Sequence, residues 1–193
     1  MIDLNNSEYE VLEGKVAFNG GQAGVIGNTK ASVVKKTAED HENAPDYKIV
    51  FTDKEGGEVN KAIYYPDSDN PKATKAMGMI VKHIFHVCKG NKDDLPLFKD
   101  YKDMVDSAMI LLKGTAPKFK ANVSTNYGSG KPEYQKAFME VRNFPPFFEL
   151  DTDVSKTRLF NSKSEFLTKK VQDNPADAFT GGNSDSSSTS DDW

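Results

Sequence analysis

The spacing of the apolar residues changes twice along this chain, and this change constrains its fold more than any other feature. Before residue 66 the apolar runs are short and alternate with polar residues, as in Tyr47–Thr52 and Val59–Tyr65. From 71 to 113 they recur every three or four residues, and from 118 onward they alternate again. A period of two is typical of half-buried strands, and a period near 3.6 is typical of amphipathic helices. The sequence therefore predicts strands, then two helices, then strands.

Four strands are predicted before the helices, at 9–18, 30–37, 47–52 and 59–65. Gly56-Gly57 favours a hairpin between the last two of them. The glycine-rich stretch 19–28 lacks the G-x-x-x-x-G-K-[ST] pattern, and no helix pattern follows it. Phosphate-binding loops need the helix N-terminus that would follow, so we interpret this stretch as a hairpin loop.

The first predicted helix, 71–89, begins after Asn70 as N-cap and ends at Gly90. The second runs from 98 to 113, with Gly114 as its expected C-cap and Pro117 beyond it. Two further strands are predicted at 118–125 and 134–143, joined by the loop 127–131. Pro145-Pro146 interrupts the pattern, and 147–150 is expected to resume pairing at a sheet edge.

Several classes of protein are disfavoured by what the chain lacks. No apolar run approaches the roughly 20 residues of a membrane helix, and MIDLNNSEYE has no signal-peptide character. The single cysteine, Cys88, excludes an internal disulfide framework and favours a reducing, cytoplasmic setting. His83 and His86 could share a helix face, but Cys88 points elsewhere and no fourth ligand is evident, so we predict no metal.

No cofactor is expected either, and catalysis finds little support in the sequence. His41 and Asp93-Asp94 fall in predicted loops, and no nucleophile has a base at a recognisable spacing. We therefore expect a protein that is not an enzyme.

The charges are unevenly distributed along the chain. The 193 residues carry a formal net charge of −4, from 25 Lys plus Arg and 29 Asp plus Glu. Residues 171–193 contribute −5 and residues 1–13 contribute −4, so residues 14–170 carry +5. A basic body between acidic ends indicates a polyanionic partner or an acidic interaction tail.

Aromatic residues lie among lysines on several predicted strands and their loops. The stretch 113–142 alone has a balance of +4. Proteins that bind single-stranded nucleic acids need this pair of features, because cations follow the phosphates and aromatic faces stack the bases. The alternative is that half of the aromatics are core and the lysines are solvated strand edges. Composition alone does not choose between these two interpretations.

The last residues favour a role in recruitment. GGNSDSSSTSDDW, 181–193, has too few apolar residues to form a core, and we interpret it as a disordered tail. It ends in Asp191, Asp192 and Trp193, the only tryptophan. An aromatic ring beside acids can dock in a basic-rimmed apolar pocket of another protein. A solubility tail is the alternative, but it does not account for the tryptophan.

Taken in order, these features resemble bacteriophage single-stranded DNA-binding proteins built on an OB-fold. The resemblance covers about 9–150 and rests on the order of elements, on VLEGKV (11–16), on 118–144 and on the terminal DDW. It differs in a long helical insertion and in ending with Trp where Phe is commoner. The resemblance implies that the acidic, aromatic-ended terminus recruits replication or recombination proteins.

We therefore predict a mainly β protein with inserted helices, an OB-fold-type five-stranded barrel with a disordered acidic C-terminal tail. Three divisions are expected. Residues 1–151 form a single-stranded DNA-binding domain, residues 152–180 form a peripheral segment, and residues 181–193 form the tail. The peripheral segment is expected to contain a short helix near 162–172. The expected function is non-sequence-specific binding of single-stranded DNA in phage replication, recombination or repair, in the host cytoplasm. The alternative is a non-enzymatic virion structural or assembly protein. The sequence leaves open the oligomeric state and the choice between DNA and RNA.

The residues expected to act are of two kinds. Those expected at the partner interface are Asp191, Asp192 and Trp193. Those expected to contact nucleic acid are Lys35, Lys48, Lys61, Tyr64, Lys118, Lys120, Tyr127, Lys131, Tyr134 and Arg142.

Overall fold

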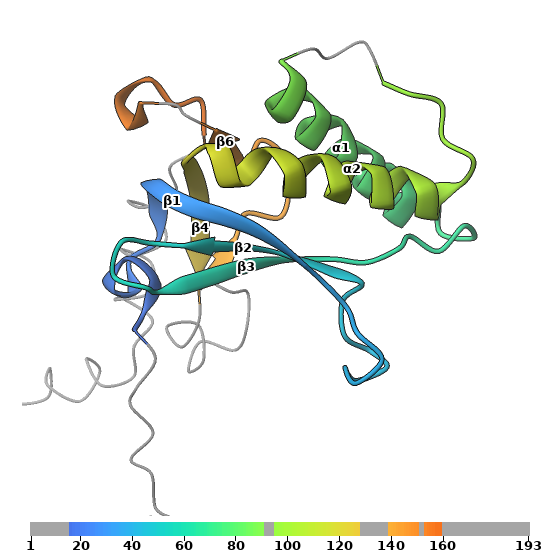
Figure 1. Cartoon of the computed structure of the whole chain (residues 1–193), viewed down its shortest axis with the longest axis horizontal. Coiled ribbons are helices and arrows are strands. Elements are labelled where there is room, and N and C mark those ends of the chain that lie inside the picture. The colour runs from blue at the N-terminus through green and yellow to red at the C-terminus, as the bar shows by residue number, and fades with distance from the viewer. Residues whose placement is uncertain (1–15, 91–94, 128–138, 151–152, 160–193) are drawn as a thin grey trace, which may run out of the picture.

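Antiparallel strands curl into a nearly closed barrel, and two helices cover one side of it (Figure 1). The computed structural model describes residues 16–90, 95–127, 139–150 and 153–159. The strands are β1 (Gly24–Lys35), β2 (Tyr47–Thr52), β3 (Glu58–Ile63), β4 (Ala121–Tyr127), β5 (Met139–Val141) and β6 (Phe148–Leu150). The helices are α1 (Pro71–Lys89) and α2 (Tyr101–Thr115), and short 3-10 turns lie at η1 (Phe18–Gly21), η2 (Ala116–Lys118) and η4 (Val154–Lys156).

The strand order is β3-β2-β1-β4-β5, and β6 also pairs with β4. β5 pairs with Thr125–Tyr127 and β6 with Ala121–Val123, so the two lie end to end along one edge of β4 and act as a single fifth strand. β3 and β5, at the two ends of the order, come into contact. This is a five-stranded barrel of the OB-fold type, with both helices inserted between β3 and β4. The predicted fold class is confirmed for the barrel and the helices.

β1 makes the barrel possible because it pairs with two different strands. Its second half, Lys30–Lys35, pairs with β2, and its first half pairs with β4. The register against β4 shifts between Ile26 and Thr29, where Asn28 has a positive φ of 61°. A bulge of this kind bends a strand and increases its twist, which lets one strand turn a barrel corner.

The start of β1 corrects the sequence prediction, which made a loop of all of 19–28. Only η1 and the residues up to Ala23 are outside the sheet. Gly27 lies within the strand, and a Cβ at this position would overlap the side chains of Val154 and Asn122. The glycine therefore reflects close packing of side chains from η4 and β4, rather than a loop. The predicted strand 9–18 lies mostly outside the described residues, and its described end enters the η1 turn at Phe18.

Both helices start where the sequence predicts a cap. The Asn70 side chain accepts a hydrogen bond from the Ala73 backbone amide (3.1 Å), and Gly90 ends α1 with a φ of 71°. Asp100 accepts from the Asp103 amide (2.8 Å) at the start of α2, which begins at Tyr101 rather than at the predicted 98. The predicted C-cap at Gly114 is wrong, because α2 continues through Thr115 and passes directly into η2.

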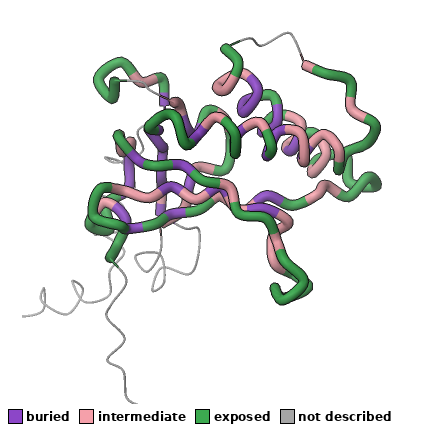
Figure 2. Tube along the Cα trace, in the orientation of Figure 1, coloured by how far each residue is buried: buried purple, intermediate pink, exposed green. Residues whose placement is uncertain are grey.

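The core lies between the inner face of the barrel and the helices, where the buried residues concentrate (Figure 2). β2 alternates buried and half-buried residues, with Tyr47, Ile49 and Phe51 facing inward. The ring of His83 on α1 packs against Phe147 and Phe148 at centroid distances of 4.9 and 5.1 Å. These contacts fix α1 to the barrel next to β6. The hairpin predicted at 52–59 is confirmed by the pairing of β2 with β3.

A carboxylate fastens α2 to the barrel. Asp106 Oδ1 accepts hydrogen bonds from the hydroxyls of Tyr47 (2.7 Å) and Tyr65 (2.6 Å). Burial alone would raise the pKa of Asp106, but the hydrogen bonds from Tyr65 and Tyr47 outweigh burial, and its pKa lies below the ordinary value. A carboxyl of this kind stabilises the fold above its unfolded-state pKa of about 3.9, and this contribution is lost as the pH falls through the folded-state pKa.

We predict that Asp106→Asn lowers the free energy of unfolding by roughly 1–2 kcal/mol at about pH 7, because two charge-assisted hydrogen bonds become neutral ones. The difference from the parent protein should shrink as the pH is lowered toward about 2, where the parent carboxyl is protonated as well. Urea unfolding at several pH values measures both effects. Asp69→Asn, in an exposed turn, is the matched control and should change little. An Asp106→Asn deficit that stays constant with pH would contradict the role of the charge.

Candidate nucleic-acid interface

An open groove with a volume of about 760 Å³ lies where the middle of β1, the end of β2 and the segment after α2 meet. β1 contributes Lys30, Ala31 and Ser32, and β2 contributes Thr52. The opposite wall is the chain from η2 to the start of β4, which is Ala116, Pro117, Lys118, Phe119 and Lys120. Three cations and one aromatic ring therefore line the groove, and no acidic residue is among the described residues of its wall.

The lysines of the groove reach the surface, and two of the three have no partner among the described residues. Lys30, Lys118 and Lys120 are all exposed. Lys30 and Lys118 make no hydrogen bond or ion pair with any other residue that the structure describes, whereas Lys120 has further contacts of its own. Sequence reasoning identified Lys118 and Lys120 but missed Lys30, which is distant in sequence and joins them only through the pairing of β1 with β4.

Phe119 is the aromatic residue of the groove and was also missed. The alternating pattern of 118–125 put it on the core face with Ala121 and Val123. In the structure β4 begins only at Ala121, and Phe119 follows the η2 turn, where its amide donates to the Ala116 carbonyl (3.2 Å). Its side chain is 39% exposed. Pro117 is the sequence feature that could have indicated that the strand starts later than the alternating pattern at 118–125 suggests.

Beyond the groove, the outer face of the β1–β2–β3 sheet carries two more of the predicted residues. Val34, Lys48 and Ala62 are cross-strand neighbours on this face. Tyr64 follows β3 on the same side of the chain as Ala62 and is 50% exposed. Because Ser32 and Val34 are two residues apart on β1, this face is continuous with the groove. Lys48 and Tyr64 thus lie on the same outer face of the sheet as the β1 side of the groove.

The ammonium groups of Lys35 and Lys61 contact other residues of the protein. The Lys35 ammonium lies 5.3 Å from the centre of the Tyr47 ring, and its hydrogen bond to the Tyr47 hydroxyl raises its pKa. Lys61 faces inward with Val59 and Ile63, so its assignment to the binding face is wrong. Its ammonium donates to the side-chain oxygen of Asn143 (3.0 Å) and lies 5.9 Å from the Phe147 ring, across the gap between β3 and β5. Burial lowers its pKa.

Tyr127 is a core residue and not an exposed stacking platform. It is 8% exposed, and its hydroxyl donates to the Gly21 carbonyl (2.8 Å), which ties β4 to the chain before β1. The ring of Tyr127 therefore lacks the exposed face on which a base could stack. Arg142 is half-buried next to β5, with its amide donating to the Ser124 carbonyl (2.9 Å). The remaining predicted residues lie outside the described ranges, namely Lys131, Tyr134, Asp191, Asp192 and Trp193, as do the segment near 162–172 and the tail 181–193.

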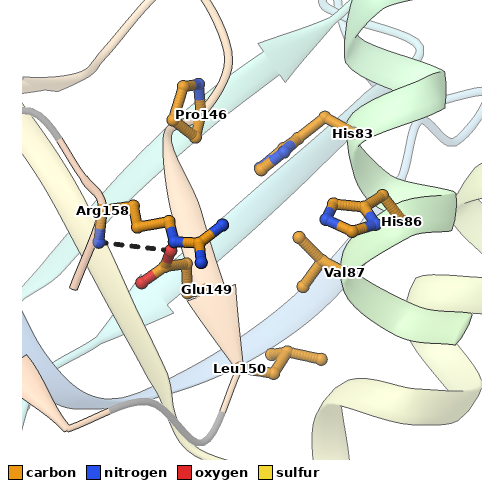
Figure 3. A pocket seen from close by; sticks show the side chains of 7 residues that line it. All are labelled: His83, His86, Val87, Pro146, Glu149, Leu150 and Arg158. Atoms are coloured by element: carbon orange, nitrogen blue, oxygen red, sulfur yellow. Dashed lines mark hydrogen bonds between the residues drawn. The ribbon is translucent and has the colours of Figure 1, made fainter. Parts of the chain in front are cut away.

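A second, smaller cavity of about 380 Å³ lies between α1 and β6 (Figure 3). His83 and His86 line it from α1, and Glu149 and Arg158 line it from the other side. Glu149 accepts hydrogen bonds from the Thr157 hydroxyl (2.8 Å) and the Arg158 amide (3.4 Å). This cavity contains a carboxylate, so it suits an anionic strand less well than the groove on β1.

The histidines of this cavity do not form a metal site with their neighbours. Burial lowers the pKa of His83 to about 4, so its ring is neutral at pH 7, and burial raises the pKa of Cys88 to about 11. Nε2 of His83 has no hydrogen-bond partner within the described part of the chain. Among the described residues, no three His, Cys, Asp or Glu side chains gather in a way that could hold a metal ion.

Neither α1 nor α2 has the length and apolar character of a membrane-spanning helix, and the described ranges contain no other candidate.

Comparison with known protein families, with curated proteins and with solved structures found no match. The function is therefore inferred from the geometry of the barrel and of the groove.

Proposed function

We propose that this protein binds single-stranded DNA without sequence preference, and that it does so in phage replication or recombination in the host cytoplasm. The observation that carries the proposal is the groove between β1 and η2, with Lys30, Lys118 and Lys120 around the exposed ring of Phe119. Binding alone, without catalysis, is the activity proposed.

The position of the groove on the barrel supports this choice of ligand. OB-fold barrels bind oligonucleotides on the face of strands 2 and 3 and with the loops after strands 1 and 4. Here that face carries Lys48 and Tyr64 and runs into the groove along β1. The segment between β4 and β5 includes Lys131 and Tyr134, which lie outside the described residues.

The chemistry of the groove explains why binding should ignore sequence. Lysine is a compact, mobile point charge, which suits phosphate oxygens and does not read the edges of bases. An aromatic face stacks on any base, at roughly 1–3 kcal/mol for each. Cations without acidic neighbours, combined with one exposed ring, therefore favour a single strand whose bases are free to stack.

The partner role of the C-terminus is part of the same proposal and concerns residues outside the described ranges. Asp191, Asp192 and Trp193 are proposed to bind replication or recombination proteins. Deleting 181–193, or changing Trp193→Ala, should remove capture of such a partner while leaving oligonucleotide affinity equal or slightly higher. Pull-down and DNA titration on the same preparations measure the two effects, and a deletion that destroys DNA binding would contradict recruitment as the role of the tail.

The binding proposal is tested by titrating fluorescent oligo-dT at several salt concentrations. About 0.7 counterions are released per neutralised phosphate of a single strand, so three or four lysine contacts predict a log–log slope of about −2 to −3. Duplex DNA of the same length should bind more weakly. Equal affinity for duplex, or no affinity for oligo-dT at low salt, would overturn the proposal.

The role of the ring is tested by Phe119→Ala. Loss of one stacked base should weaken oligo-dT binding by roughly 1–3 kcal/mol, which is about a 5- to 150-fold increase in Kd. Because the ring is partly exposed, the thermal unfolding midpoint should fall only slightly. Tyr101→Ala removes an aromatic of similar exposure, 42%, from the far end of α2 and should leave binding unchanged. If both variants bind as the parent does, the groove is not the stacking site.

A further inference from the structure

The solvent face of α1 is a line of lysines. Lys72, Lys75, Lys82 and Lys89 are all exposed, and the helix contains no acidic residue. At about 100° per residue, these four positions fall within roughly a third of the helix circumference. From the first to the last they extend over about 26 Å, at a rise of about 1.5 Å per residue. We call these four residues the lysine stripe.

The stability of the helix does not explain the stripe. Solvated helix faces normally intersperse lysine with Asp or Glu three or four residues away, and these pairs stabilise the helix. Here, Lys72 and Lys75 stand near the N-terminus, where the helix dipole disfavours cations. Lys72, Lys75 and Lys82 make no hydrogen bond or ion pair with any residue in the described ranges, and Lys89 only approaches the Phe85 ring, at 5.2 Å.

The C-terminal end of the stripe is the end nearer to the segment that forms the groove wall. The Cys88 side chain interacts with the Thr115 hydroxyl, so the C-terminal end of α1 lies against the C-terminal end of α2. Thr115 leads directly into η2, which supplies Pro117 and Lys118 to the groove. Lys89, the residue after Cys88, thus stands at the end of α1 nearer to η2, and the stripe extends from there along α1.

The composition of the stripe favours a nucleic acid over a protein as its partner. Protein interfaces concentrate aromatic residues and Arg in their centres and are depleted in Lys. The stripe consists of Lys alone, and one exposed apolar side chain, that of Met79, lies on the same face of α1. Evenly spread point charges without an apolar anchor match a phosphate backbone, which itself presents charge at regular intervals.

We propose that the lysine stripe is a second contact surface for the phosphate backbone, which holds the part of a strand that extends beyond the groove at Lys118. This inference rests on the proposed function, because it requires a strand in the groove. It predicts that the protein holds long strands more tightly, and with a steeper dependence on salt, than strands that fill the groove alone.

The experiment compares oligo-dT of about 8 nucleotides with oligo-dT of about 30, within and beyond the typical footprint of one OB barrel. The variant is Lys75→Gln with Lys82→Gln, in the middle of the stripe. Binding of the short oligomer should be unchanged. Binding of the long oligomer should weaken several-fold at low salt, and its log–log salt slope should become shallower by about 1 to 1.5, at about 0.7 per lost contact.

The matched control is Lys54→Gln with Lys99→Gln, which removes the same charge from exposed positions outside α1. It should leave both oligomers unaffected. Thermal unfolding of both double variants checks that each folds as the parent does.

The outcomes separate the two proposals. If the intact protein binds neither oligomer, the proposed function has failed. If it binds both but the stripe variant loses nothing on the long oligomer, or loses equally on both, the stripe proposal is overturned while the function stands. The same loss in the control variant would also overturn it, because the effect would then be one of net charge alone. Binding of an acidic peptide by the stripe, without any length-dependent loss of DNA binding, would assign α1 to a protein partner and also overturn the proposal.

Discussion

The barrel depends on β1 pairing with two strands at once. Its 12 residues are long enough for β2 to pair with one half and β4 with the other. The irregularity between Ile26 and Thr29 bends the strand at the change of partner. Without that bend the two halves of the sheet would lie flat, and β3 could not reach β5, where Lys61 now donates to Asn143. Lys30 comes opposite Lys118 and Lys120 only because β1 turns this corner.

The helical insertion does more than cover the barrel. α2 is held by the hydrogen bonds of Asp106 to Tyr47 and Tyr65, and its continuation through Thr115 sets where η2 begins. That turn places Pro117 and Phe119 in the wall of the groove. α1, fixed to the barrel by the His83 ring against Phe147 and Phe148, presents its lysines outward. One insertion thus supplies a wall of the proposed DNA site and the surface proposed to extend it.

The lysines that a ligand contacts matter more for its binding than the net charge of the protein does. A net charge of −4 would by itself disfavour a polyanionic ligand. At physiological ionic strength, however, exposed charges are screened over about 8 Å, so a ligand responds to the lysines that it touches more than to the total. The groove and the stripe are both free of acidic residues in their own walls. The acidic residues at 1–13 and 171–193 account for −9, which leaves the body basic.

Elements whose causes are local could be predicted from the amino-acid sequence. The hairpin at Gly56-Gly57 and the start and end of α1, at Asn70 and Gly90, follow from turn and capping chemistry within a few residues. The order of strands and helices followed from the hydrophobic period, and the barrel was predicted from the resemblance of this order to OB-fold proteins. Lys48, Tyr64, Lys118 and Lys120 were identified from residue type together with strand position, and the structure leaves them on the outside.

Long-range packing sets which side of the barrel wall each remaining residue occupies. The strand pattern at 59–65 shows that Lys61 alternates with its neighbours, but not which face is the core, because a lysine has a long apolar part that can be buried. Tyr127 was assigned to a loop, whereas β4 extends as far as this residue. Lys61 faces inward to join β3 to β5, and Tyr127 is buried with its hydroxyl on Gly21. Phe119 is exposed because η2 delays the start of β4. Lys30 joins the groove through a pairing between residues 92 apart in sequence, since Thr29 opposes Ala121. Long-range pairing and the closure of the barrel set these positions, and no local pattern encodes them.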